Sequence, residues 1–452
     1  MTVSRNPMKR LLACAIVAAF AAQAGTAGAI GMLEAYEAAL KNDPTYQAAI
    51  HENNAGQENR NLGRAGLLPN LAFSYNTSRN RSDVTTSTIR GEDTTHPEYT
   101  SKSAVLQLRQ TLFNLDVLAR YRQGVAQSQY AGAVFSNKKQ DLVLRLVGAY
   151  ADAQFTEEQL ALSIAQRDAY REQQRVNERM FEKGESTKTD VLETQSKFDT
   201  SQAQVIEAQD NVTTARNNLA AILGSDVTEL DPLVTDFRTR ALFPSNFDEW
   251  RTIALNNNPE IESLRYGVEA AAQEINKARA GHAPRVDLTA SLSRTDSDTL
   301  NTLNQEQTNR AIGLQVNVPL YSGGYVNAAS RQAVANHQRA KSELATKTNQ
   351  VLVELRKQYS MNLSSVTRID ALVKAEKSAA LLVDATRQSI KGGVRINLDL
   401  LNAQQQLFGA RRDLAQGRYN YVLSYLRLRG AAGTLGGDDL QEIAGYFKSA
   451  AR

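Results

Sequence analysis

The chain has 452 residues and a formal net charge of +4, from 52 Lys or Arg and 48 Asp or Glu residues. This near balance argues against a nucleic-acid partner, which requires a basic patch. Only nine prolines occur, and none lies between Pro97 and Pro232 or after Pro319. Because an interior proline costs a helix about 3 kcal/mol, these tracts favour long helices over a thick globular core.

The first 29 residues have the pattern of a secretory signal peptide. Three basic residues precede an apolar stretch over 11–22, and Ala27-Gly28-Ala29 provides the small residues of a cleavage site. We therefore expect export, with a signal peptide over 1–29 and a mature chain from Ile30. Cys14 opens the apolar stretch instead of following it, which disfavours the alternative of a lipid-anchored protein. If Cys14 is removed with the signal, the mature chain has no disulfide framework.

The remaining sequence contains two copies of one unit. Short stretches return at offsets of 208 to 215: 39–44 matches 254–259, 105–113 matches 313–321, and Gly184, Asp190, Gln195 and Gly224 match Gly393, Asp399, Gln404 and Gly433. The pattern predicts a first repeat over 30–225, a linker over 226–246, a second repeat over 247–434 and a C-terminal segment over 435–452.

Each repeat contains two segments in which apolar and polar residues alternate, near 70–80 and 103–113 and near 285–295 and 311–320. A period of two predicts strands, and about ten residues is the length that a tilted strand needs to cross an outer membrane. A half-buried soluble sheet alternates in the same way, so the strands alone leave both interpretations open. Four strands cannot close a barrel in lipid, so membrane strands would require oligomerisation, most simply a trimer with twelve strands.

Four long helices are expected, over 116–180, 188–224, 325–390 and 397–430. Large apolar residues recur every seven positions on the later helix of each repeat, with a ladder of mostly small residues three positions further on: Val191, Phe198, Val205, Val212 and Leu219 with Thr194, Ser201, Ala208, Ala215 and Ile222, and Leu400, Leu407, Leu414, Tyr421 and Leu428 with Ala403, Ala410, Gly417, Ser424 and Ala431. This strict period predicts closely packed, coiled helices. A periplasmic coiled-coil rod with a soluble sheet remains the alternative.

The sequence gives no indication of catalysis, of a metal site or of a cofactor. The four histidines, His51, His96, His282 and His337, are scattered, and none has a neighbour at metal-ligand spacing. Nucleophile-elbow, phosphate-loop and dinucleotide-binding motifs do not occur. We therefore expect a protein that is not an enzyme and that takes its energy from partners.

Two sequence motifs are specific enough to suggest a family. The first lies where the last strand of each repeat meets a long helix, and the second lies at the start of the last long helix. Val318-Pro319-Leu320-Tyr321-Ser322-Gly323-Gly324 corresponds to Leu112-Phe113-Asn114, and Gly393-Val394-Arg395-Ile396-Asn397-Leu398-Asp399-Leu400-Leu401-Asn402-Ala403 is followed by Arg418-Tyr419-Asn420-Tyr421. With the duplicated layout, these strings resemble the TolC family of outer-membrane factors over essentially the whole mature chain. The resemblance implies a mainly α-helical chain with membrane β-strands, which forms as a homotrimer a 12-stranded β-barrel on a long α-helical coiled-coil barrel, with 226–246 and 435–452 in an equatorial domain.

The resemblance also implies a passive conduit that opens when a periplasmic adaptor and an inner-membrane transporter dock on the coiled-coil tips. Two cargo classes stay open: polypeptides in type I secretion, driven by an ABC transporter, or small molecules in multidrug efflux, driven by an efflux pump. We favour type I secretion, because many dedicated efflux factors resemble lipoproteins and this chain is not expected to be one.

The family carries two aspartates beside the periplasmic constriction, and the first falls on Asp399. The second falls on Asn402, which implies one ring of carboxylates in the trimer and a weaker cation preference. Arg395 matches a family arginine that links neighbouring coils in the closed state, whereas Ile390 replaces a frequent tyrosine. Asp190 is the first-repeat counterpart of Asp399. Both aspartates also open helices after a glycine turn, where a carboxylate favours the helix dipole, and this role is compatible with a gate.

Overall fold

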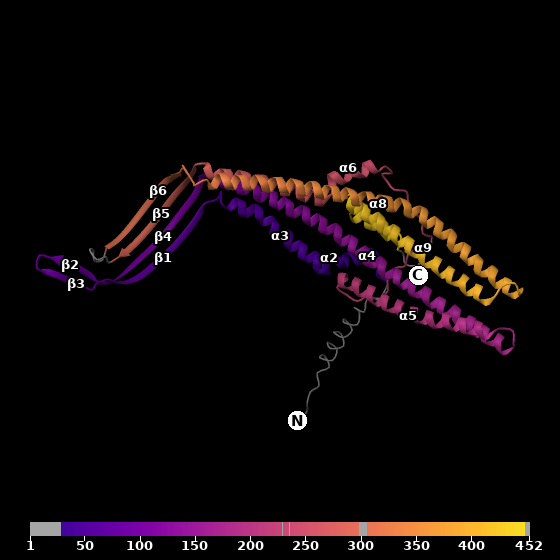
Figure 1. The fold of residues 1–452 in the computed structure, drawn as a ribbon. Helices are drawn as coiled ribbons and strands as arrows, with labels where there is room; N and C mark the ends of the chain where they lie inside the picture. Colours follow the sequence, from indigo (N-terminus) through magenta and orange to yellow (C-terminus); the bar gives the residue numbers. More distant parts are fainter. Residues whose placement is uncertain (1–28, 228, 235, 298–304, 448–452) are drawn as a thin grey trace, which may run out of the picture. The chain divides into compact units, whose positions relative to one another are not determined.

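The computed structural model describes residues 29–227, 229–234, 236–297 and 305–447 (Figure 1). The predicted signal peptide therefore lies outside the described residues, apart from Ala29. The chain forms two compact units, and each takes segments from both repeats. The helical unit comprises the described residues of Met1–Ile50, Ser136–Asn258 and Gln350–Arg452, and the strand unit comprises His51–Phe135 and Pro259–Asn349.

Four long antiparallel strands form the sheet of the strand unit. They are β1 (Asn70–Arg81), β4 (Glu98–Phe113), β5 (Arg285–Ser297) and β6 (Gln305–Asn317), and Figure 1 shows them side by side in the order β1-β4-β5-β6. The second-repeat hairpin thus pairs with the first-repeat hairpin through β4 and β5. In the single chain, β1 and β6 are the two edges of this sheet.

The structure corrects several details of the predicted strands: β4 begins at Glu98 instead of near 103, and β6 begins at Gln305 instead of near 311. β6 ends at Asn317 instead of extending to 320, and Pro319, which follows it, has no N–H to donate to a strand ladder. The loop expected between β1 and β4 contains a hairpin, β2 (Val84–Thr88) and β3 (Gly91–Thr95). Apart from Val84, the residues of its strands are polar or glycine and give no alternation, but threonine is β-branched and favours strands.

The two faces of the four-stranded sheet differ in polarity. Directly paired residues share a face, and the register Phe73↔Leu106↔Leu292 places large apolar side chains on one of them. Five further apolar residues lie on this same face and are exposed in the single chain: Leu71, Tyr75, Ile312, Leu314 and Val316. The opposite, polar face carries serine, asparagine and glutamine side chains. This is the pattern of a sheet with one face toward lipid.

The helices and their bounds are α2 (Met32–Asn42), α3 (Pro44–Ala65), α4 (Leu115–Glu182), α5 (Lys188–Leu223), α6 (Phe247–Asn257), α7 (Pro259–Arg279), the 3₁₀ turn η1 (Ala280–His282), α8 (Tyr325–Lys391), α9 (Asn397–Ala431) and α10 (Gly437–Ala444). In the helical unit, α4 runs beside α5 and α8 beside α9 (Figure 1). Among the described residues, no helix is both long enough and apolar enough to span a membrane.

The seven-residue patterns lie where these helices pack. On α5 the small residues Thr194, Ser201, Ala208 and Ala215 are buried, and on α9 all five large residues from Leu400 to Leu428 are buried. Small side chains allow the helix axes to approach closely, so the small ladder becomes the packed seam of α5. Ion pairs join the same helices, as between Arg216 of α5 and Glu157 of α4 at 2.7 Å.

The segment between the repeats contacts the end of the chain within the helical unit. Leu233 forms an antiparallel bridge with Phe447, and the Val234 N–H donates to the Tyr446 carbonyl oxygen at 2.9 Å. Arg240 forms an ion pair with Glu442 of α10 at 2.7 Å. The predicted linker and the predicted C-terminal segment therefore lie together.

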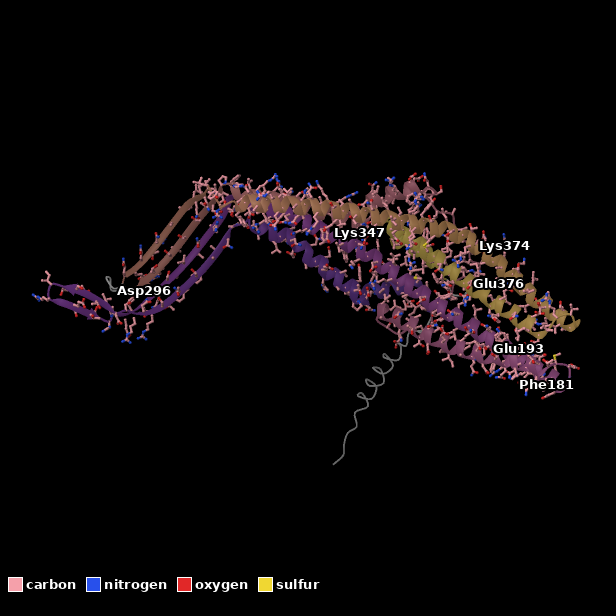
Figure 2. The ribbon with its side chains drawn as sticks, in the orientation of Figure 1. Phe181, Glu193, Asp296, Lys347, Lys374 and Glu376 are labelled. Atoms are coloured by element: carbon pink, nitrogen blue, oxygen red, sulfur yellow. The ribbon has the colours of Figure 1, made fainter. Side chains whose placement is uncertain are left out.

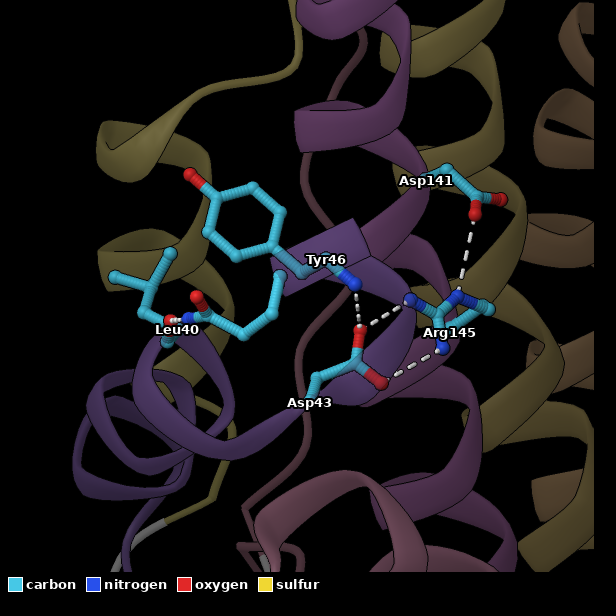
Figure 3. A network of polar contacts seen from close by, with 6 residues as sticks. Leu40, Asp43, Tyr46, Asp141 and Arg145 are labelled. Atoms are coloured by element: carbon cyan, nitrogen blue, oxygen red, sulfur yellow. Dashed lines mark hydrogen bonds and ion pairs between the residues drawn. The ribbon is translucent and has the colours of Figure 1, made fainter. Parts of the chain in front are cut away.

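A buried ion pair holds the junction between α2 and α3 against α4 (Figure 3). Asp43 stands between the two helices, with its side chain 3% exposed, and its Oδ2 lies 2.6 Å from Arg145 Nη2. The same carboxylate accepts a 2.9 Å hydrogen bond from the Tyr46 N–H and so caps α3. Arg145 also pairs with Asp141, one turn earlier on α4. Burial alone would raise the pKa of Asp43, but the bonds from Arg145 and Tyr46 hold it below its ordinary value.

Candidate functional site

The predicted gate residues lie at two equivalent turns, between α4 and α5 and between α8 and α9. In the first turn the Gly184 N–H donates to the Phe181 carbonyl oxygen, and in the second the Gly393 N–H donates to that of Ile390. Both glycines have a φ near +70°, the left-handed conformation that glycine adopts at helix C-termini. The repeat therefore extends to the backbone of the turns, and differences between them reside in the side chains.

Asp190 caps its own helix. Its Oδ2 accepts hydrogen bonds from the N–H and Oγ1 of Thr187, at 3.0 and 2.7 Å, and from Ser186 Oγ at 3.1 Å. Thr187 Oγ1 in turn accepts from the Asp190 N–H, which completes a capping box. Burial would raise the pKa of Asp190, but the bonds from Thr187 and Ser186 lower it. The helix-start role of Asp190 is therefore present in the structure.

Asp399 is held much more loosely. It lies in the first turn of α9, and its Oδ2 is 3.6 Å from Arg395 Nη1, with side chains 35% and 53% exposed. Asn402 lies three residues further along α9 and is exposed. Ile390 is partly buried and packs against a cluster that contains Val383 and Leu400, so it stabilises the α8–α9 hairpin through apolar contact. The structure thus brings Arg395 and Asp399 together within one turn.

A polar network near these turns joins the first hairpin to α9. Gln173 of α4 donates to Asn397 Oδ1 at 2.8 Å, and Asn397 Nδ2 donates to Thr194 Oγ1 at 3.2 Å. Thr194 also accepts from Asn177 Nδ2 at 2.6 Å. Asn177 and Thr194 are 2% and 0% exposed. Buried polar side chains that satisfy one another in this way fix one arrangement of the helices that carry them.

Sequence reasoning did not find this network, although one signal was available. At the offset of 209 that aligns the turns, Asn177 corresponds to Thr386 and Thr194 to Ala403. In the second repeat, Ala403 packs in an apolar cluster with Val383, and Thr386 takes the place of the asparagine. A polar pair in only one of two repeats indicates a contact that the other repeat does not make.

Exposed apolar side chains surround both turns. Phe181, labelled in Figure 2 at the end of α4, is 46% exposed. Val394 and Ile396, which flank Arg395, are 82% and 62% exposed. Large apolar side chains at a protruding turn mark a surface that is suited to contact with another protein.

The arrangement at the turns can hold or release helices and can present charge, but it offers no catalytic constellation. Among the described residues, no group of three or more His, Cys, Asp or Glu side chains is placed to hold a metal ion. Ion pairs along these helices join neighbouring turns or neighbouring helices, as Glu376 of α8 (Figure 2) does with Arg411 of α9 at 3.1 Å.

The model of the outer membrane efflux protein family matches this chain over residues 35–225 and 250–434. The chain belongs to this family. It is 42% identical to the alkaline protease secretion protein AprF of Pseudomonas aeruginosa over 93% of this chain and 88% of that protein. It is 38% identical to the proteases secretion protein PrtF of Dickeya chrysanthemi, over 94% and 93% of the two chains. Outer membrane protein TolC of Escherichia coli is 28% identical, over 96% and 88%.

Solved structures have the same fold. The outer membrane protein VceC of Vibrio cholerae superposes with a TM-score of 0.76 at 19% identity, over 89% of this chain and 96% of that chain. The expected family, the mainly helical fold with a membrane sheet and the outer-membrane location with a periplasmic extension are therefore confirmed. Family membership also overturns the alternative of a periplasmic rod with a soluble sheet. The family consists of channel proteins, and the two turns lie at the ends of the long helices of this chain.

Proposed function

We propose that three copies of this chain form one channel through the outer membrane. β1 and β6 are open edges in the single chain, and an unpaired backbone group costs several kcal/mol in lipid. Pairing β6 of each copy with β1 of the next closes a barrel of twelve strands, whereas four strands are too few. The long helices would continue this barrel into the periplasm. The contacts between Leu233 and Phe447 support an equatorial domain built from 226–246 and 435–452.

We infer that the cargo is protein and that the route is type I secretion. The observation that carries this inference is the identity of 42% and 38% to two protease secretion proteins, each matched over most of its length. The channel itself does no chemistry, so an inner-membrane ABC transporter supplies the energy. A periplasmic adaptor would dock on the exposed apolar side chains at the turns, Phe181, Val394 and Ile396.

The test is the protein content of the culture medium with the gene, without it and with it restored, under identical growth. Loss of one or a few specific proteins, returning on restoration, is expected and identifies the cargo. An unchanged medium contradicts protein secretion. If the cells without the gene then become sensitive to small toxic compounds, the second candidate, an efflux pump partner, takes its place. The family name, outer membrane efflux protein, favours that candidate.

We further propose that the two turns form the periplasmic gate, with Asp399, Asn402, Arg395 and Asp190 around it. Asp399 is the candidate to face the passage, because its carboxylate makes a 3.6 Å ion pair with the exposed Arg395, whereas Asp190 is engaged in the capping box of α5. In a trimer, Asp399 would form a ring of three carboxylates beside the constriction.

Replacing Asp399 by Asn is expected to weaken the block of single-channel current by a trivalent cation roughly tenfold, about 1.4 kcal/mol. The reason is the loss of three negative charges that attract a multivalent cation together. The measurement is current in planar bilayers as the cation is titrated, with Asp190→Asn compared alongside, where a smaller change is expected because its carboxylate is held in the capping box of α5. An identical block in Asp399→Asn and wild type removes Asp399 from the gate.

The converse change, Asn402→Asp, is expected to strengthen the same block by a similar factor. Asn402 is exposed three residues beyond Asp399 on α9, so an added carboxylate would place a second ring next to the first. Titration of the blocking cation against this variant checks the result. Unchanged block would place the exposed side of α9 away from the passage.

Replacing Asn397 by Ala is expected to raise the open probability of the channel about tenfold. The change removes two hydrogen bonds that join α9 to the first hairpin, with Gln173 and Thr194, and such bonds contribute about 0.5–1.5 kcal/mol each. Gln405→Ala is the matched control, because Gln405 makes one exposed bond from α9 to Lys197 of α5. Equal open probabilities in single-channel recordings of Asn397→Ala and Gln405→Ala would contradict a clamp at Asn397.

A further inference from the structure

Arg310 lies on the apolar face of the sheet, within a row of apolar residues. The register pairs it with Leu292, which pairs with Leu106, which pairs with Phe73. The next residue of β6 on this face, toward the helices, is Ile312. Arg310 is exposed in the single chain. A cationic side chain therefore stands on the face that the barrel turns to lipid, where an uncompensated arginine costs up to about 4 kcal/mol according to depth.

The other cations on this face have acidic partners. Five cations share the face: Arg79, Arg81, Lys102, Arg294 and Arg310. Four of them form ion pairs, with Glu98, Asp296 or Glu306. Among the described residues, Arg310 has no acidic partner, since Glu306 is the residue that pairs with Arg294.

A neighbouring copy would not supply the missing carboxylate from its adjoining strand. β6 is an edge strand, and in the proposed trimer it pairs with β1 of the next copy. β1, Asn70–Arg81, contains no Asp and no Glu, so pairing at any register places no acidic side chain of that strand beside Arg310. β1 contributes instead two further arginines, Arg79 and Arg81, near its outer end. The adjoining strand therefore supplies no anion to Arg310.

A depression of about 460 Å³ opens on the apolar face at the same place. Its apolar walls include Leu108, Leu292 and Ile312, around the small side chain of Ala290, and Arg310 is its one charged lining residue. The combination joins an apolar hollow with a guanidinium group, which binds phosphate oxygens in a bidentate manner. It fits a molecule with an acyl chain and a phosphate group.

We propose that Arg310 binds a phosphate group of a phosphorylated glycolipid of the outer leaflet, with an acyl chain of that lipid in the depression over Ala290. The placement agrees with topology, because Arg310 ends the apolar row of Val316, Leu314 and Ile312 on the side nearer the start of β6, where Thr308 and Glu306 follow it on this face. A basic group at the edge of an apolar band is the arrangement by which membrane proteins hold anionic headgroups. The acyl chain would lie over β5 within one copy, with the phosphate group at the edge strand β6.

The experiment is native mass spectrometry of the detergent-solubilised mature protein titrated with bisphosphorylated lipid A. Wild type is expected to bind it, and Arg310→Gln is expected to bind it about tenfold more weakly, as for loss of one charge-assisted hydrogen-bonded contact. Arg285→Gln is the matched control, because Arg285 lies on the polar face at the other end of β5 and its loss leaves binding unchanged. Ala290→Leu, which fills the depression, is expected to weaken binding without a change of charge.

Three results would overturn the proposal. The first is equal binding of lipid A by wild type and Arg310→Gln. The second is equal binding of lipid A and its dephosphorylated form, which would leave an acyl contact alone. The third is displacement of bound lipid A by inorganic phosphate at equal concentration, which would leave an ion site without the acyl contact. Recovery of the same oligomer from each variant shows that the comparison concerns binding.

Discussion

Replacing Trp250 by Ala is expected to lower the free energy of unfolding by about 4 kcal/mol, since aromatic-to-alanine changes in cores cost about 3–5 kcal/mol. Trp250 is fully buried between α6, α8 and α9, where it packs with Ala254, Leu355 and Leu428. Its Nε1–H also donates a 2.7 Å hydrogen bond to the Pro244 carbonyl oxygen. The substitution therefore leaves both a cavity and an unpaired carbonyl group.

Chemical denaturation of the solubilised protein, followed by far-ultraviolet circular dichroism, measures this loss. Trp250→Phe is the graded control, because it keeps most of the packing and loses only the indole bond, for an expected cost of about 1–2 kcal/mol. The chain contains a single tryptophan, so the fluorescence of the wild type reports the undocking of α6 alone. A loss below 1 kcal/mol in Trp250→Ala would show that α6 is not anchored through this side chain.

Trp250 also illustrates how far a duplicated sequence predicts structure. At the offset of 215, Trp250 corresponds to Ala35, and Ala254 corresponds to Ala39. All four are fully buried, so the repeat correctly indicates which helix positions face the core. The core volume at each position does not follow from the repeat, because it depends on which helices pack there. Ala35 in α2 and Trp250 in α6 occupy equivalent buried positions, but the space that each side chain fills is set by different neighbouring helices.

The strands were predictable where lipid imposes a period of two, and less so elsewhere. Alternation over 285–295 follows from one apolar and one polar face, and β5 covers it. Beyond the apolar band both faces are polar, so alternation no longer marks where a strand lies. For this reason the sequence did not predict the start of β6 at Gln305, which lies in a stretch without alternation. The hairpin of β2 and β3 was missed because it has no periodic signal.

The turns divide in a similar way. The capping box of Asp190 is local and readable, because Thr187 and Asp190 stand three residues apart. The network of Asn397 with Gln173 and Thr194 joins residues that are more than 200 positions apart in the sequence. Such contacts depend on the packing of the hairpins, which composition and spacing do not fix. Local hydrogen bonds were thus within reach of the sequence, and bonds between hairpins were not.

Replacing Asp43 by Ala is expected to lower the free energy of unfolding by about 3 kcal/mol. About 1 kcal/mol of this is the lost cap of α3, since Asp43 accepts from the Tyr46 N–H. The remaining roughly 2 kcal/mol is the ion pair with Arg145. Breaking a fully buried pair costs about 3–5 kcal/mol, but Arg145 is 32% exposed and regains part of its hydration when Asp43 is removed.

Asp43→Asn separates the two terms, because asparagine keeps a capping oxygen and loses the charge. The second repeat carries this change, since Asn258 stands at the equivalent position and donates to the Ala431 carbonyl oxygen at 2.9 Å. We expect Asp43→Asn to cost about 2 kcal/mol. Asp141→Asn is the control: its carboxylate pairs with the same arginine but is 46% exposed, so a change of a few tenths of a kcal/mol is expected.

The pH dependence gives an independent test of the ion pair. The pKa of Asp43 is lower in the folded chain than its ordinary value of 3.8. Its contribution to stability is therefore complete above that value and is lost as the pH falls through the lowered pKa. Wild type and Asp43→Asn should differ by a constant amount at neutral and mildly acidic pH, and the difference should close only in stronger acid. A difference that already closes well above the ordinary value of 3.8 would assign the effect of Asp43 to something other than its charge. The two helix junctions thus occupy equivalent positions in the repeats but are held by different interactions. The first has an ion pair between Asp43 and Arg145, and the second has a hydrogen bond from the neutral side-chain amide of Asn258.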